Sequence, residues 1–536
     1  MKKLFTVLTI CLITLSACSQ KKNTVGIKHT PIIKEETNYQ TIELKDLSNS
    51  YISNDNDSFK EATNTYTDFA LNIYKECYKD NSENSLLSPY SLYSALSILA
   101  NGTNNNTAKL MESFLGMSVE DLNNYNKDIL DHSTLNSANG LWFNNANNLT
   151  LKDSFKSTIS QYYGSDAIKE TSFANKENVV NEVNDWAYHK SNNTIDNILS
   201  NNDVNESDSF LLLNALAIDE YWQLPFDSNE TYSQEFHNLD GSTGNATMMH
   251  QTIDGYWHTN DAQGFMKPAG QYYLVGILPN EGVDYETFIN NLDSTYINNF
   301  INSEIKDENY DPNTNTADLH RTVLSFPKFS NTNEYDLTNH LKKLGLNEIF
   351  TSADFTNMAD GDENTISKIF LSTVKQKNNV EINEEKVKMS SVTLVKADLG
   401  AAGPKFNYID HEVTFDRPFI YLLVKNNRFA EGISMISTNQ EDYAHLPLFI
   451  GSISYLNDSN VTEKKQDDCL GNVTIKADAI KVRQEPSLSG KHLSSVKKGQ
   501  SMKVYDIKSN EGYTWYMINQ DEWIADDGSW LEYNKM

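Results

Sequence analysis

Residues 380–415, which read VEINEEKVKMSSVTLVKADLGAAGPKFNYIDHEVTF, begin as a strand and continue as a long connection. Apolar and polar side chains alternate over the first residues, as they do in a strand. The connection from Glu385 to Phe415 has β-forming residues in its first half and the small, flexible GAAGP (400–404) in its second. A loop this long inside a compact domain is usually functional or disordered. Two interpretations stay open on these residues alone: a plain solvated loop, or a loop that can become a strand of a metastable sheet.

The segments around this stretch alternate between helix-like and strand-like patterns. Early segments are mostly helical and late ones mostly extended, which favours an α+β domain. Helical spacing of apolar residues predicts helices over 62–77, 91–99, 152–163, 176–199, 285–301 and 336–347. Short aliphatic and aromatic runs predict strands over 137–144, 210–219, 271–278, 320–330, 369–383, 417–425 and 447–455.

The composition restricts the class of protein. The chain has 536 residues, with 44 Lys plus Arg against 73 Asp plus Glu, and a net charge of −29. Surfaces that bind nucleic acid need clustered Lys and Arg, so we expect no nucleic-acid partner. Hydrophobic residues make up 39%, which is compatible with a packed core. With 4 Cys the chain is not a disulfide scaffold, and a bridge between Cys77 and Cys469 is no better supported than two free thiols.

The N-terminus has the form of an export signal. A basic start, an apolar run from Leu4 to Leu15 and small residues precede Cys18. Residues 15–18 (LSAC) resemble the bacterial lipoprotein signal, in which the chain is cut before a Cys that then carries lipid; an ordinary signal peptide is the alternative. We expect a signal peptide over 1–17, a lipid anchor on Cys18 and a flexible tether over 18–55. The protein would then sit on the extracellular face of a bacterial membrane, or be secreted.

The sequence contains none of the common catalytic or cofactor motifs. It has no phosphate-binding Walker loop, no dinucleotide glycine fingerprint, no HExxH, no CxxC and no Gly-x-Ser-x-Gly. The 11 His are scattered without ligand spacing. We therefore expect no enzyme, no cofactor and no metal site.

From about Asp55 to Leu456 the chain resembles the serpin family. Each motif alone is weak, but a dozen follow one another at the family's spacing. The resemblance implies a serpin domain over 56–456, with three β-sheets, about nine helices and an exposed reactive loop. The main motifs are 84–92 (NSLLSPYSL), 137–142 (SANGLW), 184–199, 213–222, 248–251 (MMHQ), 277–279 (ILP), 326–329 (FPKF), 344–355, 416–419 (DRPF) and 447–451 (PLFIG).

Serpins are protease inhibitors that act once, so the resemblance implies an inhibitor of serine or cysteine proteases. A target protease cuts the loop and becomes acylated, and the loop then inserts into the main sheet as a new strand. Family spacing from Glu384 places the cut bond at Gly400–Ala401, and the loop is several residues longer than usual. A small Gly-Ala-Ala tip suits elastase-like or subtilisin-like proteases, whereas Lys396 would suit a trypsin-like one.

The loop hinge departs from the family pattern. Glu384 and Glu385 match it, but Lys386 replaces a Gly, and Met389 begins a run that should be small. In an extended strand Lys386 and Lys388 share one face, while Val387 and Met389 share the other and point into the sheet. Ser390 and Ser391 are small, so insertion remains open.

The region where the family's main sheet opens also shows one departure. Ser88, Ser91 and Asn214 match the family, but Gln376 stands where the family has a His. An amide can both donate and accept, so Gln376 is able to substitute. Trp222 lies where the top of the sheet opens, and Lys328 and Glu384 occupy positions that form an ion pair in some relatives.

The last sixty or so residues resemble a bacterial SH3-type domain. A polar linker over 457–469 precedes short strands and turns over 470–536, a pattern typical of a small all-β barrel. Relatives often bind cell-wall peptides or glycans, so peptidoglycan is a candidate partner. Tyr513 and Trp523 are candidate wall-binding residues; the alternative is that such aromatics fill a small core.

Two functions follow from the resemblance. The first is a surface-anchored suicide inhibitor of proteases. The second is a non-inhibitory serpin fold used as a binding or adhesion module at the cell wall. Lys386 and Met389 favour the second, whereas Ser390, Ser391 and the length of the loop favour the first.

Overall fold

The computed structural model describes most of the chain after Asn38, with internal gaps. Cys18, Cys469 and the hinge beyond Val387 lie outside the described residues, so the predictions made for them are not addressed. The described residues are 39–80, 83–131, 137–145, 149–164, 167–191, 195, 197–216, 218, 220–311, 314, 316–366, 369–387, 405–426, 445–457, 470–519 and 522–535.

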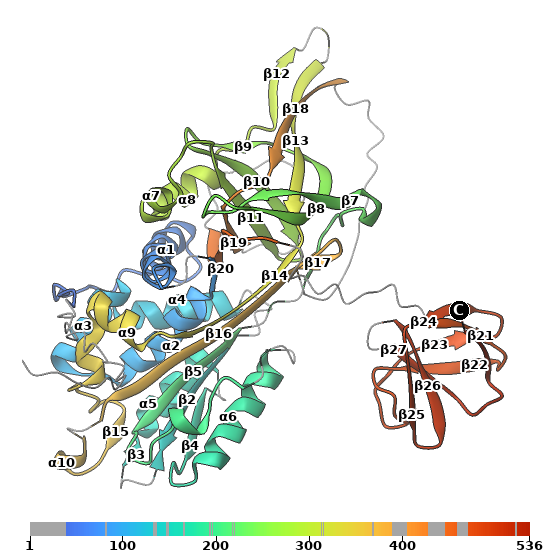
Figure 1. The fold of residues 1–536 in the computed structure, drawn as a ribbon. Helices are drawn as coiled ribbons and strands as arrows, with labels where there is room; N and C mark the ends of the chain where they lie inside the picture. Colours follow the sequence, from blue (N-terminus) through green and yellow to red (C-terminus); the bar gives the residue numbers. More distant parts are fainter. Residues whose placement is uncertain are drawn as a thin grey trace, which may run out of the picture. The chain divides into compact units, whose positions relative to one another are not determined.

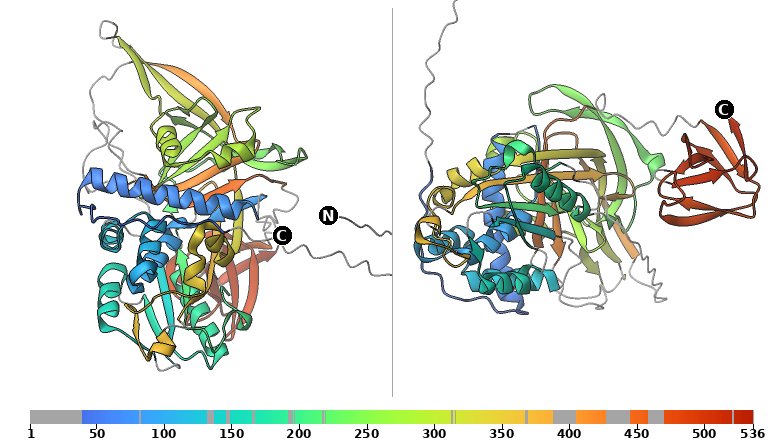
Figure 2. Two further views of the ribbon diagram at one scale, coloured as in Figure 1. Left: turned by 90° about the vertical axis from the view of Figure 1, so that its left-hand side faces the viewer. Right: turned by 90° about the horizontal axis from the view of Figure 1, so that it is seen from below.

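Helices dominate the first part of the body (Figure 1). The longest, α1, starts where the Asp55 carboxylate accepts a hydrogen bond from the Ser58 amide, and it carries a buried aromatic stripe. Figure 2 shows α1 as one long helix. No helix among the described residues is long and apolar enough to span a membrane. The α-helices are α1 (Asn56–Tyr78), α2 (Pro89–Gly102), α3 (Asn105–Leu115), α4 (Val119–Asp131), α5 (Asp153–Tyr163), α6 (Lys176–Lys190), α7 (Tyr285–Asn290), α8 (Ser294–Ile301), α9 (Thr338–Leu341) and α10 (Glu363–Ile366).

A seven-stranded sheet, called here the main sheet, forms the centre of the body. Its central strands β5 and β16 are parallel, and β14 flanks β16 on the other side. Its strands, in order, are β4 (Ile168–Thr171), β2 (Ser137–Asn144), β5 (Phe210–Leu216), β16 (Leu371–Ile382), β17 (Lys386–Val387) and β6 (Glu220–Tyr221), with β14 (Phe329–Asp336) paired to β16.

Two further sheets complete the body. One has the order β1 (Asn84–Leu87), β20 (His445–Ile453), β19 (Phe419–Asn426), β11 (Tyr272–Pro279), β10 (Ala262–Ala269) and β9 (Trp257–His258). The other has the order β12 (Asp307–Asp311), β13 (Thr316–Pro327), β8 (Thr243–Asp254) and β7 (Thr231–His237), with β18 (Lys405–Thr414) parallel to β13. A short pair joins β3 (Thr150–Leu151) to β15 (Ala359–Asp360). The predicted arrangement of three sheets and about nine helices is confirmed, apart from short extra elements.

The main sheet is covered on both faces. On one face α6 packs Val179, Val183 and Ala187 against Trp142 and Leu213 of the strands. On the other face α2 and its neighbouring helices form the large core, which contains Tyr66, Leu96 and Leu212. Burial on both faces explains why β5 (FLLLNAL) is almost wholly apolar, whereas β16 alternates buried and partly exposed side chains.

The segment from Tyr39 to Asn54, predicted as part of the tether, lies against the helical part of the body. The Gln40 amide donates to the Lys343 carbonyl (2.9 Å), and the Ser50 and Tyr51 amides donate to the Asp121 carboxylate (2.9 and 3.0 Å). The Tyr51 hydroxyl donates to Asp128 (2.7 Å). The contacts supply hydrogen-bond donors to two carboxylates that α4 buries, Asp121 and Asp128.

The C-terminal residues form two antiparallel sheets instead of the single closed barrel that we expected. The three-stranded sheet has the order β24 (Ser501–Val504), β21 (Gly471–Ile475) and β28 (Leu531–Lys535). The five-stranded sheet has the order β23 (His492–Lys497), β22 (Ala479–Arg483), β27 (Glu522–Asp526), β26 (Tyr513–Asn519) and β25 (Asp506–Asn510). Alternation along β26 and β27 gives the larger sheet two apolar faces, one around Ile524 and one around Trp515.

The contacts of the Tyr39–Asn54 segment predict that replacing the Asp121 side chain lowers the stability of the protein. In Asp121→Ala the Ser50 and Tyr51 amides lose their acceptor, and the thermal midpoint should fall by several degrees, equivalent to about 1–3 kcal/mol. Limited proteolysis should then cut between residues 39 and 54 faster than in the native protein. Glu120→Ala is the matched control, because Glu120 is a neighbour on α4 whose only role in this contact is an exposed bond to Asn49. Equal effects of the two substitutions would contradict the assignment.

Candidate functional site

The central feature of the site is the point where the long loop leaves the main sheet. After β16 the chain turns back at once, and β17 pairs with the end of β16 through Ile382 and Val387. On its other side β17 pairs with β6, through Lys386–Tyr221 and Val387–Glu220. The first residues of the loop therefore occupy a strand position between β16 and β6 at the top of the sheet.

The pairing of β5 with β16 ends just below this point. It runs from Phe210–Leu371 to Asn214–Gln376. Because β6 follows β5 closely in the chain, Val387 lies between β16 and the strand that follows β5. Its side chain is buried in the main core, while Lys386 stays partly exposed with its ammonium over the Tyr221 ring (5.7 Å). The two side chains thus point to opposite faces, as the sequence alternation indicates.

A turn around Trp222 holds the base of the loop. The Trp222 amide donates to the Glu385 carbonyl (3.1 Å), and its indole Nε1–H donates to the Asn383 carbonyl (2.8 Å). The Phe226 amide donates to the Glu384 carbonyl (2.9 Å). Three consecutive carbonyls of the hinge are therefore bound by one turn. Trp222 itself is buried, so it acts both in packing and in holding the hinge.

An ion pair closes the outer side of the same hinge. The Lys328 ammonium lies 3.2 Å from the Glu384 carboxylate, as the sequence comparison with relatives implied. The lysine side chain is 45% exposed, so the pair contributes little to stability and mainly fixes the direction of the chain.

Beneath the Trp222 turn lies a buried cation that the sequence analysis missed. Lys267 of β10 is 2% exposed, and its Nζ donates to the Leu224 carbonyl (2.6 Å) and to the Gln251 side chain. The ammonium also lies over the rings of Phe226 (4.5 Å) and Trp222 (5.3 Å). Burial lowers the pKa of Lys267 to about 7. A lone Lys in an alternating strand gives no sequence signal that distinguishes it from a surface lysine.

Lower in the sheet, Gln376 joins β16 to the start of α2. Its Oε1 accepts from the Ser88 amide (3.1 Å), and its Nε2 donates to the Ser88 carbonyl (2.8 Å). Asn378 also donates to the Gln376 Oε1 (3.0 Å). The amide thus uses both its donor and its acceptor, which a His could not do in the same way. Ser91 is buried in the same helix, and Asn214 is the backbone neighbour of Gln376 on β5.

The structure therefore brings together most of the residues predicted for the sheet-opening region. They form two groups along β16: Ser88 and Gln376 meet low on the strand, and the group at its top comprises Trp222, Lys328, Glu384, Glu385, Lys386 and Val387. Lys388, Met389, Ser390, Ser391, Gly400 and Ala401 lie outside the described residues, as does the side chain of Asn214.

The candidate wall-binding residues of the C-terminal domain have different environments. Trp523 is 4% exposed and packs with Trp515 and Ala525, so it fills a small core and is not open to a ligand. The wall-binding role of Trp523 stays a prediction, and its burial favours the alternative that such aromatics fill a small core. Tyr513 is partly buried and packs against Trp530 with ring centroids 5.4 Å apart.

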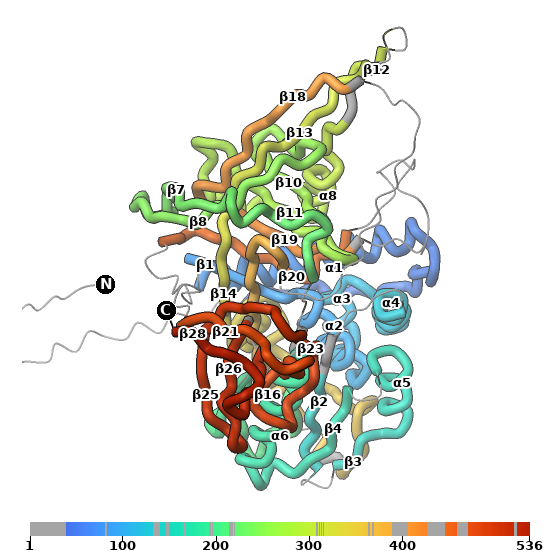
Figure 3. The backbone as a smooth tube through the Cα atoms, turned by 90° about the vertical axis from the view of Figure 1, so that its right-hand side faces the viewer, coloured from blue at the N-terminus to red at the C-terminus, as the bar shows by residue number. Residues whose placement is uncertain are grey.

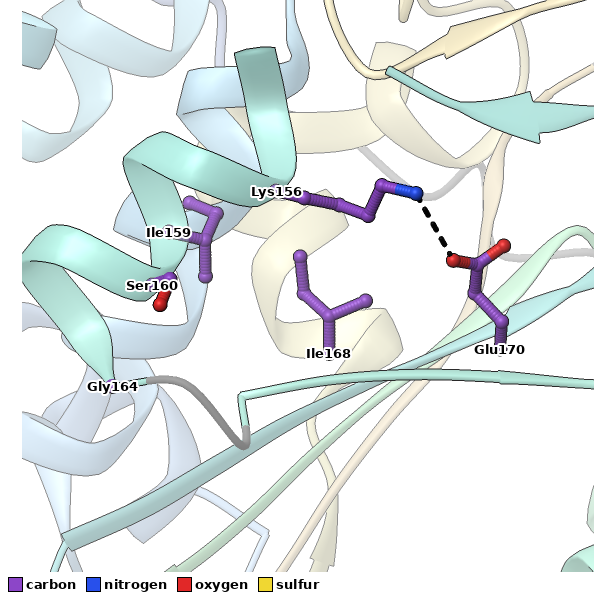
Figure 4. Close-up of a pocket in the computed structure, with 6 residues that line it drawn as sticks. All are labelled: Lys156, Ile159, Ser160, Gly164, Ile168 and Glu170. Carbon is purple, nitrogen blue, oxygen red and sulfur yellow. Dashed lines mark hydrogen bonds and ion pairs between the residues drawn. The ribbon is translucent and has the colours of Figure 1, made fainter. Parts of the chain in front are cut away.

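The described residues hold no arrangement of side chains that suggests catalysis. They contain no cluster of three or more His, Cys, Asp or Glu side chains placed to hold a metal ion. Cys77 is buried and free, and burial raises the pKa of its thiol. A pocket of about 260 Å³ lies between α5 and β4, far along the chain from the hinge, where Lys156 and Glu170 are 3.4 Å apart (Figure 4). Its lining includes Ile159 and Ile168 but no nucleophile paired with a base.

The body thus combines a central parallel strand pair, a hinge that enters the sheet at its top and a long loop beyond it. The family model for serpins, described as serine protease inhibitors, matches residues 64–430. The chain belongs to the serpin family.

Curated relatives span several kingdoms. Plasminogen activator inhibitor 1 of Neovison vison is 24% identical over 377 residues, covering 67% of this chain and 88% of that protein. Serpin-Z3 of Arabidopsis thaliana is 27% identical over 369 residues, covering 65% and 89%. An uncharacterised serpin-like protein of Thermococcus kodakarensis is 26% identical over 381 residues, covering 68% and 82%.

Solved structures confirm the fold. The thermophilic serpin tengpin in its native state is 28% identical, with a TM-score of 0.60, covering 77% of this chain and 98% of that one. Human thyroxine-binding globulin is 18% identical, with a TM-score of 0.60, covering 74% and 99%. The second likeness shows the fold alone.

The two hydrogen bonds between Gln376 and Ser88 predict that replacing Gln376 lowers the thermal stability of the protein. Gln376→Leu removes the acceptor of the buried Ser88 amide and one donor to the Ser88 carbonyl, which keeps the Leu92 amide (3.4 Å), at a cost of about 1–3 kcal/mol. The thermal midpoint of the intact protein should fall accordingly, as measured by differential scanning calorimetry. Asn379→Leu, at an exposed position on the same strand, is the control and should leave the midpoint nearly unchanged. A Gln376→Leu variant as stable as the native protein would contradict the account.

The burial of Lys267 predicts how the stability of the protein changes with pH. The unfolded chain keeps this lysine protonated up to about pH 10.4, whereas the folded state releases the proton near pH 7. Between these values the unfolded state binds more protons, so this group makes the protein more stable as the pH rises. The thermal midpoint of the native protein should therefore rise relative to that of Lys267→Met between pH 7 and about pH 9.

Lys425 also contributes to the pH dependence of the thermal midpoint, but its contribution is the same in the native protein and in Lys267→Met. Burial also lowers the pKa of Lys425, to about 8, and Lys425 is present in both proteins. A difference in midpoint that does not change with pH would show that Lys267 titrates normally in the folded state.

Proposed function

We propose that the protein inhibits serine proteases by the cleavage and insertion of its long loop. The observation that carries the proposal is the position of Val387, buried between β16 and β6 above the end of the β5–β16 pairing. Insertion would continue a strand that has already begun. Membership of the serpin family and the relatives named as inhibitors support the same function.

The proposed reaction starts with the protease. Its catalytic serine attacks the carbonyl carbon of Gly400, the amide bond breaks, and the new amino group leaves on Ala401. The product is an ester between the protease and the loop. Hydrolysis of that ester by water would free the protease, so inhibition requires insertion to be faster than hydrolysis. Each inserted residue gains sheet hydrogen bonds and buries every second side chain.

We infer the target class from the small loop tip. Gly400, Ala401 and Ala402 fit the narrow pockets of elastase-like and subtilisin-like proteases. A cysteine protease would form the corresponding thioester. Because the loop is longer than usual, the position of the cut bond is part of the proposal. Sequencing of the released fragment will locate this bond.

We further propose that the inhibitor is held at the outer face of a bacterial membrane by lipid on Cys18, or is otherwise secreted. The export-type N-terminus and the LSAC sequence at 15–18 support this location. The C-terminal residues would act as an SH3-like, wall-binding domain, with peptidoglycan as ligand. Tyr513, rather than the buried Trp523, is the aromatic residue available for that role.

The second candidate function is a non-inhibitory binding or adhesion module. Lys386 favours it, because a long charged side chain stands where the family's hinge has glycine. The fold also serves binding in another member, since thyroxine-binding globulin is known in complex with thyroxine. The two functions differ in whether the loop inserts after cleavage.

Incubation with proteases, followed by denaturing gels, separates the two. The soluble body is mixed with elastase-like, subtilisin-like, trypsin-like and papain-like proteases. An inhibitor gives a complex that survives denaturation, and mass spectrometry of its released fragment gives the bond. Cleavage by every protease without a complex would contradict inhibition and favour the binding module.

Val387→Asp tests the step after cleavage. A carboxylate at this buried position would disrupt the strand position from which insertion has to continue, so the yield of complex should fall at least about tenfold while cleavage of the loop continues. Lys386→Glu is the matched control, because the neighbouring side chain faces the exposed side and should preserve the complex. Similar yields from both variants would show that the hinge does not enter the sheet.

A further inference from the structure

The β12, β13 and β18 strands extend beyond the sheet to which they belong. β13 pairs with β8 only from Arg321 to Pro327. Its first residues, from Thr316 to Leu319, lie between β12 and β18. We call this part, with β12 and the first half of β18, the ribbon. Figures 1 and 3 show it projecting from the body.

One face of the ribbon displays large aromatic side chains to solvent. Phe406 is 41% exposed and Tyr408 is 57% exposed, and their ring centroids are 6.4 Å apart. Both belong to β18 and are separated by one residue, so they share a face. Two neighbouring exposed aromatics on a projecting ribbon are typical of a surface that binds a protein.

A cation and a carboxylate hold this aromatic face in place. The Arg321 guanidinium lies 4.0 Å from the centre of the Tyr408 ring. The same guanidinium donates two hydrogen bonds to the Asp410 carboxylate, at 2.8 and 2.9 Å. Because Tyr408 is already ordered, binding a partner there costs less side-chain entropy than ordering a free side chain. Phe406, Tyr408, Arg321 and Asp410 are called here the aromatic face.

The opposite face of the same strands is occupied within the molecule. His411 of β18 stacks on Tyr256 with ring centroids 3.9 Å apart, and its Nε2 lies 2.9 Å from the Nδ1 of His320. Where β18 continues into the body, the side opposite Asp410 is thus used for packing, whereas the aromatic face stays exposed to solvent at Phe406 and Tyr408.

The aromatic face lies close in sequence to the proposed cut bond. Phe406 follows Ala401 by five residues, which span at most about 18 Å when extended. A protease domain of roughly 230 residues has a radius of gyration of about 17 Å. A protease bound at Gly400–Ala401 therefore reaches the start of β18.

The ribbon strands are also acidic. β12, β13 and β18 together contain six carboxylate residues, Asp307, Glu308, Asp311, Asp318, Asp410 and Glu412, against Arg321 and Lys405. The net negative charge of these strands favours a cationic partner and speeds its approach.

We propose that the aromatic face is a second contact surface for the target protease, selecting a cationic elastase-type enzyme. This inference rests on the proposed function, because it takes the protease to be the partner that the loop engages. The face supplies binding energy outside the active-site cleft of the protease and so determines how fast, and with which protease, the loop reacts.

The test compares Phe406→Ala/Tyr408→Ala with the native protein against a cationic elastase. The second-order rate of loop cleavage or complex formation should fall at least about tenfold, which corresponds to the loss of two exposed aromatic contacts. The native rate should also fall with added salt. Tyr232→Ala is the matched control, because Tyr232 is 53% exposed on β7 of the same sheet but at its opposite edge.

The readouts separate this proposal from the proposed function. If no stable complex forms but cleavage is slowed in the double variant, inhibition is wrong and the contact surface stands. If complexes form at the native rate in the double variant, the contact surface is wrong and inhibition stands. An equal loss in Tyr232→Ala, or no reaction of the loop with the elastase, would also overturn the contact surface. Thermal midpoints of all variants verify that they are folded.

Discussion

The limited pairing between β5 and β16 is the constraint on which the rest of the structure depends. Two parallel central strands are hydrogen-bonded as far as Asn214 and Gln376, and above that point Val387 of the hinge takes a strand position. A strand that continued from Val387 would pair with β16 on one side and with the β5–β6 side on the other, which is the arrangement that the proposed insertion requires.

Two groups of contacts stabilise this arrangement, one low on β16 and one at the hinge. Low on the strand, Gln376 ties β16 to Ser88 at the start of α2, which resists separation of the central strands. At the top, the Trp222 turn binds three hinge carbonyls and rests on the buried Lys267. In the proposed insertion, β5 and β16 separate and the contacts of Gln376 with Ser88 break. The contacts of the Trp222 turn with the hinge carbonyls then keep the hinge at the top of the sheet. A buried lysine with a lowered pKa reduces the free energy of unfolding at pH values below the pKa that it has in the unfolded chain.

Much of this could be predicted from the sequence, and the exceptions have physical causes. The strands over 137–144 and 369–383 and the helix from about 62 to 77 are confirmed within a few residues, because their apolar periodicity is strong. The helices α3 and α4 were missed, since Asn-rich polar residues conceal a narrow apolar stripe. The helix predicted over 176–199 ends at Lys190. Lys267 and Trp523 could not be assigned, because their burial depends on strands distant in sequence.

The central claim is that the native sheet is metastable and gains a strand when the loop is cut. It is tested most directly by the thermal midpoint of the soluble body before and after a single cleavage between residues 388 and 404. The account predicts that the cut protein unfolds at a markedly higher temperature, with slower amide hydrogen exchange in β5 and β16, because a new strand fills the gap between them. A cut protein with the same or a lower midpoint, and unchanged exchange in these strands, would contradict it.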